Sequence, residues 1–249
     1  MIKFFKDFIQ SIIKLFGFKV SRLDTNFKYD NRFKILLKEV KPFTMTSDDR
    51  IHNLYLSINY ILKNEILGDF VECGVWKGGS MMLAAKILKK NKSKRMLFLY
   101  DTFEGMTKPD FNDFTLESNN GKKKNAETLL KKNKDLMCIA NIDEVKKNLN
   151  STGYPNEYIN FIKGDVKQTL SRNSPDKIAL LRLDTDWYES TKIELDLLFP
   201  KLTQGGVLII DDYKSWEGCK KAVDDYFKDK KNIYFHSIDD QAILGIKLY

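Results

Sequence analysis

The chain has 249 residues, of which 43% are hydrophobic, enough for one large domain with an added segment. Its net charge of +8 at pH 7 would attract anionic partners, but the excess lysines stand in runs without interleaved aromatic residues, which favours a solvated surface over a groove for single-stranded nucleic acid. Three cysteines without a CxxC pair argue against a zinc site or a disulfide framework and fit a reducing cytoplasm.

The first predicted element is an amphipathic helix near the amino terminus. Apolar residues recur at helical spacing from Phe5 to Phe16, and lysines interrupt them, so no apolar run reaches the roughly 18 residues of a membrane-spanning helix. We expect this helix to pack within the protein or a dimer, with membrane contact as the alternative. No signal peptide is indicated. Residues 1–43 are predicted to form a helical extension, followed by a catalytic domain at 44–249.

The segment from 46 to 67 has helical apolar spacing, with Ser47 as a predicted N-cap. Beyond it, β-rich runs alternate with helical stretches, which predicts parallel βαβ units of a doubly wound, Rossmann-like α/β fold. The runs are DFVEC, SMMLAAKIL, MLFLYD, YINFIKGD, KIALLRLD, ESTKIELDLLF, GGVLIIDD, a further helix, IYFH and AILGIKL. Near-continuous apolar strands such as IALLRL predict a sheet covered on both faces.

A lysine- and asparagine-rich stretch between about residues 106 and 157 interrupts this alternation. Within it, NIDEVKKNLNST has the character of a helix. A structureless loop of this length would be unusual in a compact domain, so we predict a partly helical insertion that acts as a mobile lid over the site.

The first candidate binding element is the strand-to-helix turn in DFVECGVWKGGS. Glu72 lies near the end of the strand, and Gly74, Gly78 and Gly79 follow, which would let a ligand approach the backbone and the N–H groups of the helix N-terminus. The pattern is not GxGxxG, and Glu72 would repel a diphosphate but tolerate a sulfonium and an amino group. The turn therefore favours S-adenosylmethionine over NAD, with a ligand-free turn as the alternative.

Aspartates end the next two predicted strands. Asp101 follows LFLY, where a doubly wound fold offers a carboxylate to the ribose hydroxyls of a nucleoside, and Asp165 follows FIKG, where an acceptor could meet an adenine amino group. Either residue could instead cap the turn that follows it.

A third group of acidic residues predicts a metal site. Asp184 ends the strand in LLRLDTDW, and Asp211 and Asp212 end the strand in GGVLIIDDY. Neighbouring parallel strands lie about 4.8 Å apart, so these carboxylates would converge at one edge of the sheet and repel one another unless a cation such as Mg²⁺ compensates. Asp186 competes with Asp184 for this role, and Asp184 is favoured as the ligand.

Other chemistry-bearing residues give weaker signals. His52 and His236 lack partners at metal-ligand spacing, although His52 could reach the site. The tryptophans Trp76, Trp187 and Trp216 could flank an adenine or a sugar, or pack in the core. The sequence contains neither a GxSxG elbow nor a GxxxxGK[ST] loop, which argues against an α/β serine hydrolase and a P-loop kinase.

Several motifs in order resemble the TylF/MycF, or macrocin-type, sugar O-methyltransferases, a family of metal-dependent class I methyltransferases. From about Thr44 to Tyr213 they are TMTSDDRIHNLYL, GDFVECGVWKGGSMM, YDTFEGM, IDEVKKNLNSTGYPNEYINFIKGDVKQTL, LLRLDTDWYESTKIELDLLFPKL and GGVLIIDDY. The chain departs from the family at Thr185, where a glycine is common, and in the unfamiliar segment 106–141, which would line the acceptor site.

The resemblance implies a seven-stranded sheet with an antiparallel last strand and S-adenosylmethionine over Glu72, Gly74, Asp101 and Asp165. It also implies Mg²⁺ on the three aspartates and closure of Thr44 and Met45 over the cofactor. We include in the predicted cofactor site the neighbouring residues Gly78, Gly79, Ser80, Thr102, Phe103 and Val166.

The expected reaction is methylation of a sugar hydroxyl. A metal would hold two neighbouring sugar oxygens and lower the pKa of one of them, and Asp184 or Asp186 would be the general base. We expect a cytoplasmic enzyme, as a dimer, acting on a nucleotide-activated sugar for bacterial capsule or lipopolysaccharide, because a lysine-rich lid suits a diphosphate. The alternatives are a macrolide-type natural-product glycoside, an RNA-binding or RNA-modifying role, and a silent interaction module; no nucleic-acid partner and no stable membrane insertion are expected.

Overall fold

A computed structural model describes residues 29–115, 123–133 and 137–249. The predicted amphipathic helix at residues 5–16 lies outside them. The chain divides into two compact units, Met1–Lys34 and Ile35–Tyr249. Helix α2 (Asn31–Val40) begins in the first unit, where Asp30 Oδ1 accepts the N–H of Phe33 at 2.7 Å, as an N-cap does. The predicted division of the chain after residue 43 stays a prediction.

The second unit is built on one seven-stranded sheet in the order β3-β2-β1-β4-β5-β7-β6. The strands β1 to β5 pair in parallel, and β7 runs antiparallel to both of its neighbours, as predicted. The strands are β1 (Asp69–Cys73), β2 (Leu97–Asp101), β3 (Ile159–Lys163), β4 (Ile178–Leu183), β5 (Leu202–Ile210), β6 (Ile233–Ser237) and β7 (Ile243–Lys247). The strand order reverses between β1 and β4, which is where doubly wound folds open a crevice for ligands.

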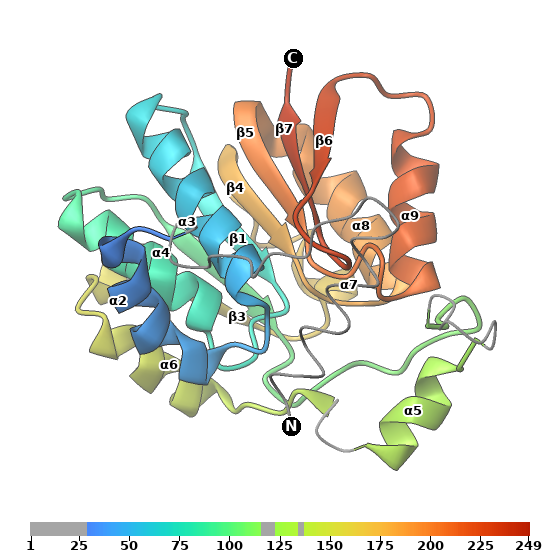
Figure 1. Ribbon diagram of the computed structural model, residues 1–249. Coiled ribbons are helices and arrows are strands. Elements are labelled where there is room, and N and C mark those ends of the chain that lie inside the picture. The colour runs from blue at the N-terminus through green and yellow to red at the C-terminus, as the bar shows by residue number, and fades with distance from the viewer. Residues whose placement is uncertain (1–28, 116–122, 134–136) are drawn as a thin grey trace, which may run out of the picture. The chain divides into compact units, whose positions relative to one another are not determined.

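Helices cover both faces of the sheet, with α3, α4 and α6 on one side and α7, α8 and α9 on the other (Figure 1). The elements are η1 (Lys41–Phe43), α3 (Asp48–Lys63), α4 (Gly79–Lys90), α5 (Ala126–Lys132), α6 (Ile142–Ser151), η3 (Asn156–Tyr158), α7 (Val166–Thr169), α8 (Tyr188–Leu198), η4 (Phe199–Lys201) and α9 (Glu217–Phe227). All six residues of β4 are buried, which confirms the prediction of an internal sheet. Within the described residues, no helix is both long and apolar enough to span a membrane.

Helix boundaries follow capping residues in the sequence. Ser47 is the N-cap of α3, and its hydroxyl accepts the N–H of Arg50 at 3.2 Å, which confirms the predicted cap. Asn141 caps α6 in the same way by accepting the N–H of Glu144 at 2.9 Å. The helix predicted within NIDEVKKNLNST is thereby confirmed as α6.

The insertion between β2 and β3 is partly helical, as predicted, and α5 lies apart from the sheet (Figure 1). One of its contacts with the rest of the domain is made by Asp113, a buried residue whose carboxylate accepts the N–H of Tyr188 at 3.0 Å. Tyr188 is the first residue of α8, where backbone N–H groups lack helical partners. Asp113 therefore helps to hold the insertion against the helix that follows β4. The predicted mobility of the insertion stays a prediction.

Candidate active site

A cavity of about 670 Å³ lies at the carboxyl ends of β1, β2, β4 and β5, within the size range of small-molecule sites. Most of the predicted site residues line it together. They are Thr44, Met45, Gly74, Gly79, Ser80, Asp101, Thr102, Asp165, Val166, Asp184, Asp186, Asp211 and Asp212. The fold thus brings the glycine turn and the aspartates into one cavity.

The turn after β1 requires glycine at two positions, because its backbone lies very close to residues of neighbouring elements. Gly74 has φ of +82°, and a Cβ there would lie 1.9 Å from the carbonyl oxygen of Asp184. Gly78, the N-cap of α4, has φ of +87°, and its Cβ would lie 2.7 Å from Leu149 Cδ2. Left-handed backbone of this kind strains any residue with a side chain. The first glycine therefore joins the ends of β1 and β4, and the second fits α4 against α6.

Asp101 holds this turn in place. Its Oδ2 accepts the backbone N–H groups of Val75 at 2.7 Å and Trp76 at 2.9 Å, and its Oδ1 accepts the N–H of Phe103 at 2.7 Å. The carboxylate also lines the cavity. Asp101 thus links the turns after β1 and β2, which is a structural role, and its carboxylate also remains accessible to a ligand in the cavity.

Asp165 has the same dual position. Its Oδ1 accepts the N–H of Lys167 at 2.9 Å, which makes it the N-cap of α7, and the residue also lines the cavity. The capping interpretation and the binding interpretation are compatible at this position, because a carboxylate has two oxygens and several lone pairs.

Three predicted cofactor residues lie outside the cavity lining: Glu72, Gly78 and Phe103. Phe103 is buried and its ring faces Phe161 of β3 at a centroid distance of 6.4 Å. Glu72 is 1% exposed, and burial raises its pKa to about 8 even though Arg182 beside it favours the charged form. One of its carboxylate oxygens, Oε2, has no hydrogen-bond partner among the described residues.

The three predicted metal ligands converge as expected. Asp184, Asp211 and Asp212 each offer one oxygen, and these oxygens lie within 4.8 Å of one another. The Oδ2 atom of Asp212 is buried without a hydrogen-bond partner in the described part of the chain. Burial and the neighbouring carboxylates raise the pKa of Asp212 well above its usual range. Three hard oxygen donors, one of them unsatisfied, fit a divalent cation such as Mg²⁺.

Arg182 lies beneath these carboxylates and was not predicted. Its Nη1 is 2.8 Å from Glu72 Oε1 and 2.7 Å from Asp184 Oδ2, and its Nη2 is 2.8 Å from Asp211 Oδ1. The side chain is 4% exposed. Burial disfavours its charge, but the carboxylates outweigh that effect and hold its pKa above the ordinary arginine value. The signal in the sequence was an arginine inside a buried apolar strand, which needs acidic partners.

A second arginine reaches Asp211 from α3. Arg50 Nη1 lies 2.6 Å from Asp211 Oδ2, and Arg50 Nε lies 2.8 Å from Asp239 Oδ2. The hydroxyl of Thr46 adds a contact of 3.2 Å to Asp211 Oδ2. Burial alone would raise the pKa of Asp239, but hydrogen bonds from Arg50 and from backbone N–H groups lower it to about 2. Asp211 is thus held from two sides.

Asp186 faces the cavity from a strained backbone. Its φ is +67°, uncommon for a residue other than glycine, and such strain concentrates at functional sites. Burial raises its pKa to about 7, and the negative charges of Asp184 and Asp211 add to the effect. Thr185 stabilises the loop, because its hydroxyl donates to the buried Glu194 at 2.9 Å from Oε1. The departure from the family's glycine at this position therefore ties the loop to α8.

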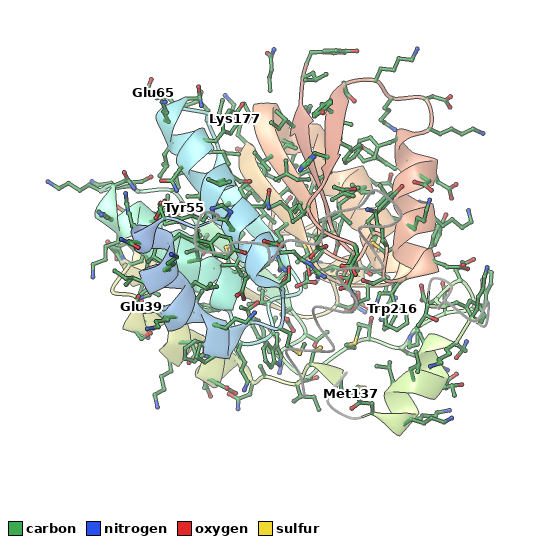
Figure 2. The ribbon with its side chains drawn as sticks, viewed as in Figure 1. Glu39, Tyr55, Glu65, Met137, Lys177 and Trp216 are labelled. Atoms are coloured by element: carbon green, nitrogen blue, oxygen red, sulfur yellow. The ribbon has the colours of Figure 1, made fainter. Side chains whose placement is uncertain are left out.

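Aromatic residues and the insertion form another wall. Trp187 and Trp216 meet edge to face with ring centroids 5.0 Å apart, and Trp187 Nε1 donates to the carbonyl of Thr107 at 3.0 Å. The side chains of Leu130 and Met137 pack against this pair, and Figure 2 labels Trp216 and Met137.

All three tryptophans, Trp76, Trp187 and Trp216, line the cavity. Trp187 and Trp216 also pack against the insertion. His52 does not line the cavity; its ring stacks on Tyr55 within α3. His236 lies on β6, also away from the cavity lining.

A seven-stranded sheet in this order, with a glycine turn after β1 and acidic residues at the carboxyl ends of β2, β4 and β5, defines a methyltransferase of the class I fold.

The chain belongs to the macrocin O-methyltransferase (TylF) family, which it matches over residues 10–244. Demethyldecarbamoylnovobiocin O-methyltransferase of Streptomyces niveus is 34% identical over 184 residues, which span 74% of this chain and 67% of that protein. The 8-demethyl-8-(2,3-dimethoxy-alpha-L-rhamnosyl)-tetracenomycin-C 4'-O-methyltransferase of Streptomyces olivaceus is 32% identical, with the same two coverages of 74% and 67%. The structure of the O-methyltransferase NovP matches with a TM-score of 0.72 at 29% identity, covering 83% of both chains. This chain is therefore an O-methyltransferase.

Proposed function

We propose that this O-methyltransferase transfers the methyl group of S-adenosylmethionine to a sugar hydroxyl with the help of a divalent cation. The observation that carries the proposal is the convergence of Asp184, Asp211 and Asp212 in the cavity that also contains the glycine turn. A sugar acceptor is supported by a relative whose name specifies a rhamnosyl substrate.

In this proposal the cofactor lies at the ends of β1, β2 and β3. Gly74, Gly79 and Ser80 would approach it with backbone and hydroxyl groups, and Asp101 and Asp165 would accept hydrogen bonds from its ribose and adenine. Thr44, Met45, Thr102 and Val166 complete the contacting set. Glu72 would act from below the turn through its hydrogen bond with Arg182, because it is buried and does not line the cavity.

Asp184, Asp211 and Asp212 would hold Mg²⁺ or a similar ion. Asp211 accepts a hydrogen bond from Arg50 and forms an ion pair with Arg182, and because each carboxylate oxygen has more than one lone pair, Asp211 would still be able to bind a cation. When bound, the ion would supply Lewis-acid polarisation of the acceptor oxygen and a template for the sugar.

Asp186 is the proposed general base. It lines the cavity two residues beyond Asp184, and its raised pKa, about 7, is near the working range of a base at neutral pH. Its carboxylate would take the proton of the sugar hydroxyl as the oxygen bonds to the methyl carbon, and the departing sulfur would become the neutral thioether of S-adenosylhomocysteine. Asp184 is the poorer base, because it is paired with Arg182 and would also be a metal ligand.

For the acceptor, we favour a natural-product type of glycoside over a nucleotide-activated sugar of capsule or lipopolysaccharide synthesis. The relatives act on compounds of the novobiocin and tetracenomycin types. Among the described lining residues, the cations Arg50 and Arg182 are paired with carboxylates, whereas Lys214 hydrogen-bonds to the neutral hydroxyl of Ser237 at 2.8 Å. A diphosphate would therefore find few uncommitted cations in that part of the site.

The test is methyl transfer from labelled S-adenosylmethionine to a panel of rhamnosylated glycosides and nucleotide sugars, with Mg²⁺ or with EDTA. We expect EDTA-sensitive transfer to a glycoside. Transfer to nucleotide sugars alone would restore the capsule or lipopolysaccharide hypothesis, and EDTA-resistant transfer would remove the metal from the proposal.

Cytoplasmic location and a dimeric state stay predictions, and the comparisons favour the enzyme over the RNA-binding alternative.

A further inference from the structure

Arg182 joins acidic residues from three adjacent strands. It faces Glu72 across the β1–β4 register, and Asp184 and Asp211 follow the last residues of β4 and β5. One guanidinium nitrogen contacts both Glu72 and Asp184, and another contacts Asp211, all at 2.7 to 2.8 Å. The group is therefore fixed between residues predicted to serve the cofactor and residues predicted to hold the metal.

We propose that Arg182 is a positioning residue that sets the spacing of Asp184 and Asp211 and thereby the affinity of the three-aspartate site for a divalent cation. This inference rests on the metal role in the proposed function. It concerns an arginine that touches neither cofactor nor acceptor in that scheme and acts through the carboxylates that it holds.

The geometry suits arginine and not lysine. Arg182 Nη1 donates hydrogen bonds to Glu72 and Asp184, and Nη2 forms an ion pair with Asp211 without hydrogen-bond geometry. A planar guanidinium holds these two nitrogens at a fixed separation, so the position of one carboxylate constrains the position of the other, whereas an ammonium group is a point charge on a flexible stem. Asp211 has further partners in Arg50 and Thr46, but Arg182 is the cationic partner of Asp184 among the described residues. Loss of the fork would release Asp184 first.

The positive charge of Arg182, taken alone, predicts the opposite effect on metal affinity. A fixed positive charge beside a cation site repels the ion, so its removal would strengthen metal binding if repulsion dominated. If positioning dominates, removal lets the carboxylates of Asp184, Asp211 and Asp212 move apart under their mutual repulsion, and metal binding weakens. The two effects can be separated by one variant that keeps the charge and one that removes it.

The experiment is calorimetric titration of Mn²⁺ into the wild-type protein, Arg182→Lys and Arg182→Met. S-adenosylhomocysteine is titrated into the same three proteins to test whether the cofactor site is still intact. We expect both variants to lose Mn²⁺ affinity by on the order of tenfold, as for other residues that orient metal ligands. S-adenosylhomocysteine affinity should change less than Mn²⁺ affinity. Unchanged or tighter Mn²⁺ binding in Arg182→Met would overturn the inference.

Arg95→Lys is the matched control. Arg95 is a partly buried arginine at the amino end of the strands, where its guanidinium donates to the backbone carbonyls of Ile66 and Gly68. Its substitution removes a comparable fork far from the aspartates. We expect a lower melting temperature with unchanged Mn²⁺ affinity. If Arg95→Lys weakens Mn²⁺ binding as much as Arg182→Lys does, general destabilisation explains the result and the inference is wrong.

Crystals of the wild-type protein grown with and without Mn²⁺ test the inference even if the Arg182 variants fail to fold. The guanidinium should keep its contacts to Asp184 and Asp211 in both crystals, and its departure from either residue on metal binding would contradict a positioning role. Failure of the proposed function has a different signature, because a wild-type protein that binds no Mn²⁺ removes the metal role itself. Normal wild-type binding with equal affinity in the variants removes only the role of Arg182.

Discussion

The two halves of the cavity are built from different chemistry. At the ends of β1 and β2, backbone groups make the contacts: Gly74 meets the carbonyl of Asp184, and Asp101 collects N–H groups from two turns. At the ends of β4 and β5, charged side chains meet one another, with Arg182 and Arg50 between the carboxylates. We call the first the backbone half and the second the charged half. Binding to the backbone half should be sensitive to added side-chain volume, and binding to the charged half should be sensitive to charge, metal and pH.

The largest effect is expected from Gly74→Ala. The new Cβ would lie 1.9 Å from the Asp184 carbonyl in a backbone with φ of +82°. We expect a loss of roughly 2–4 kcal/mol in the free energy of unfolding and loss of S-adenosylhomocysteine binding, measured by denaturation and calorimetry. Gly153→Ala is the control, since its φ is +68° but its Cβ would meet only the end of the flexible Lys89 side chain. Equal losses in both variants would show that backbone strain, and not the close approach, matters.

Removal of metal should act on the charged half alone. With EDTA, we expect methyl transfer to fall by about a hundredfold or more, because Lewis-acid catalysis contributes several kcal/mol to transition-state stabilisation. Binding of S-adenosylhomocysteine should persist, since Gly74, Ser80 and Asp101 do not depend on the ion. An equal loss of turnover and of S-adenosylhomocysteine binding would show that the two halves do not act independently.

Asp101→Asn probes the backbone half without adding volume. The aspartate uses both oxygens to accept N–H groups, whereas asparagine must turn an NH₂ group toward one of those donors. We expect a loss of about 1–3 kcal/mol in unfolding free energy and weaker S-adenosylhomocysteine binding, with Mn²⁺ affinity unchanged. A variant as stable as the wild type would mean that the turn does not depend on this carboxylate.

The smallest expected effect is the pH dependence supplied by Asp239, which supports Arg50 in the charged half. Its pKa is about 2 in the folded protein, below its ordinary value of 3.8, so its stabilising contribution is present above about pH 4 and is lost as the pH falls toward 2. The stability difference between wild type and Asp239→Asn should therefore shrink below pH 4 in denaturation experiments. A difference that stays constant from pH 7 to pH 2.5 would contradict the assigned pKa.

Much of the fold followed from local features of the sequence. Buried apolar runs predict the strands, Ser47 predicts the start of α3, and the carboxyl-end rule for parallel strands predicts that Asp184, Asp211 and Asp212 lie together. These predictions succeeded because hydrophobic periodicity, capping and strand direction are read from neighbouring residues.

The support of the site could not be predicted in the same way. Arg182 contacts Glu72, which is 110 positions away, and Arg50 contacts Asp211, which is 161 positions away. Such pairings depend on strand order and on which face each side chain takes, neither of which spacing reveals. The same limitation applies to Glu72, whose place in the sequence predicts contact with the cofactor although the residue lies below the turn, and to Asp113, whose contact with α8 has no signal in the local sequence.

The most direct test of the two-part site is one pair of titrations on the wild type, one variant and one control variant. S-adenosylhomocysteine and Mn²⁺ would each be titrated into the wild type and into Asp184→Asn, with Asp196→Asn, an exposed substitution on α8, as control. We expect Asp184→Asn to lose Mn²⁺ binding while it keeps S-adenosylhomocysteine binding, and we expect Asp196→Asn to keep both. Retained Mn²⁺ binding in Asp184→Asn, or absent S-adenosylhomocysteine binding in the wild type, would contradict it.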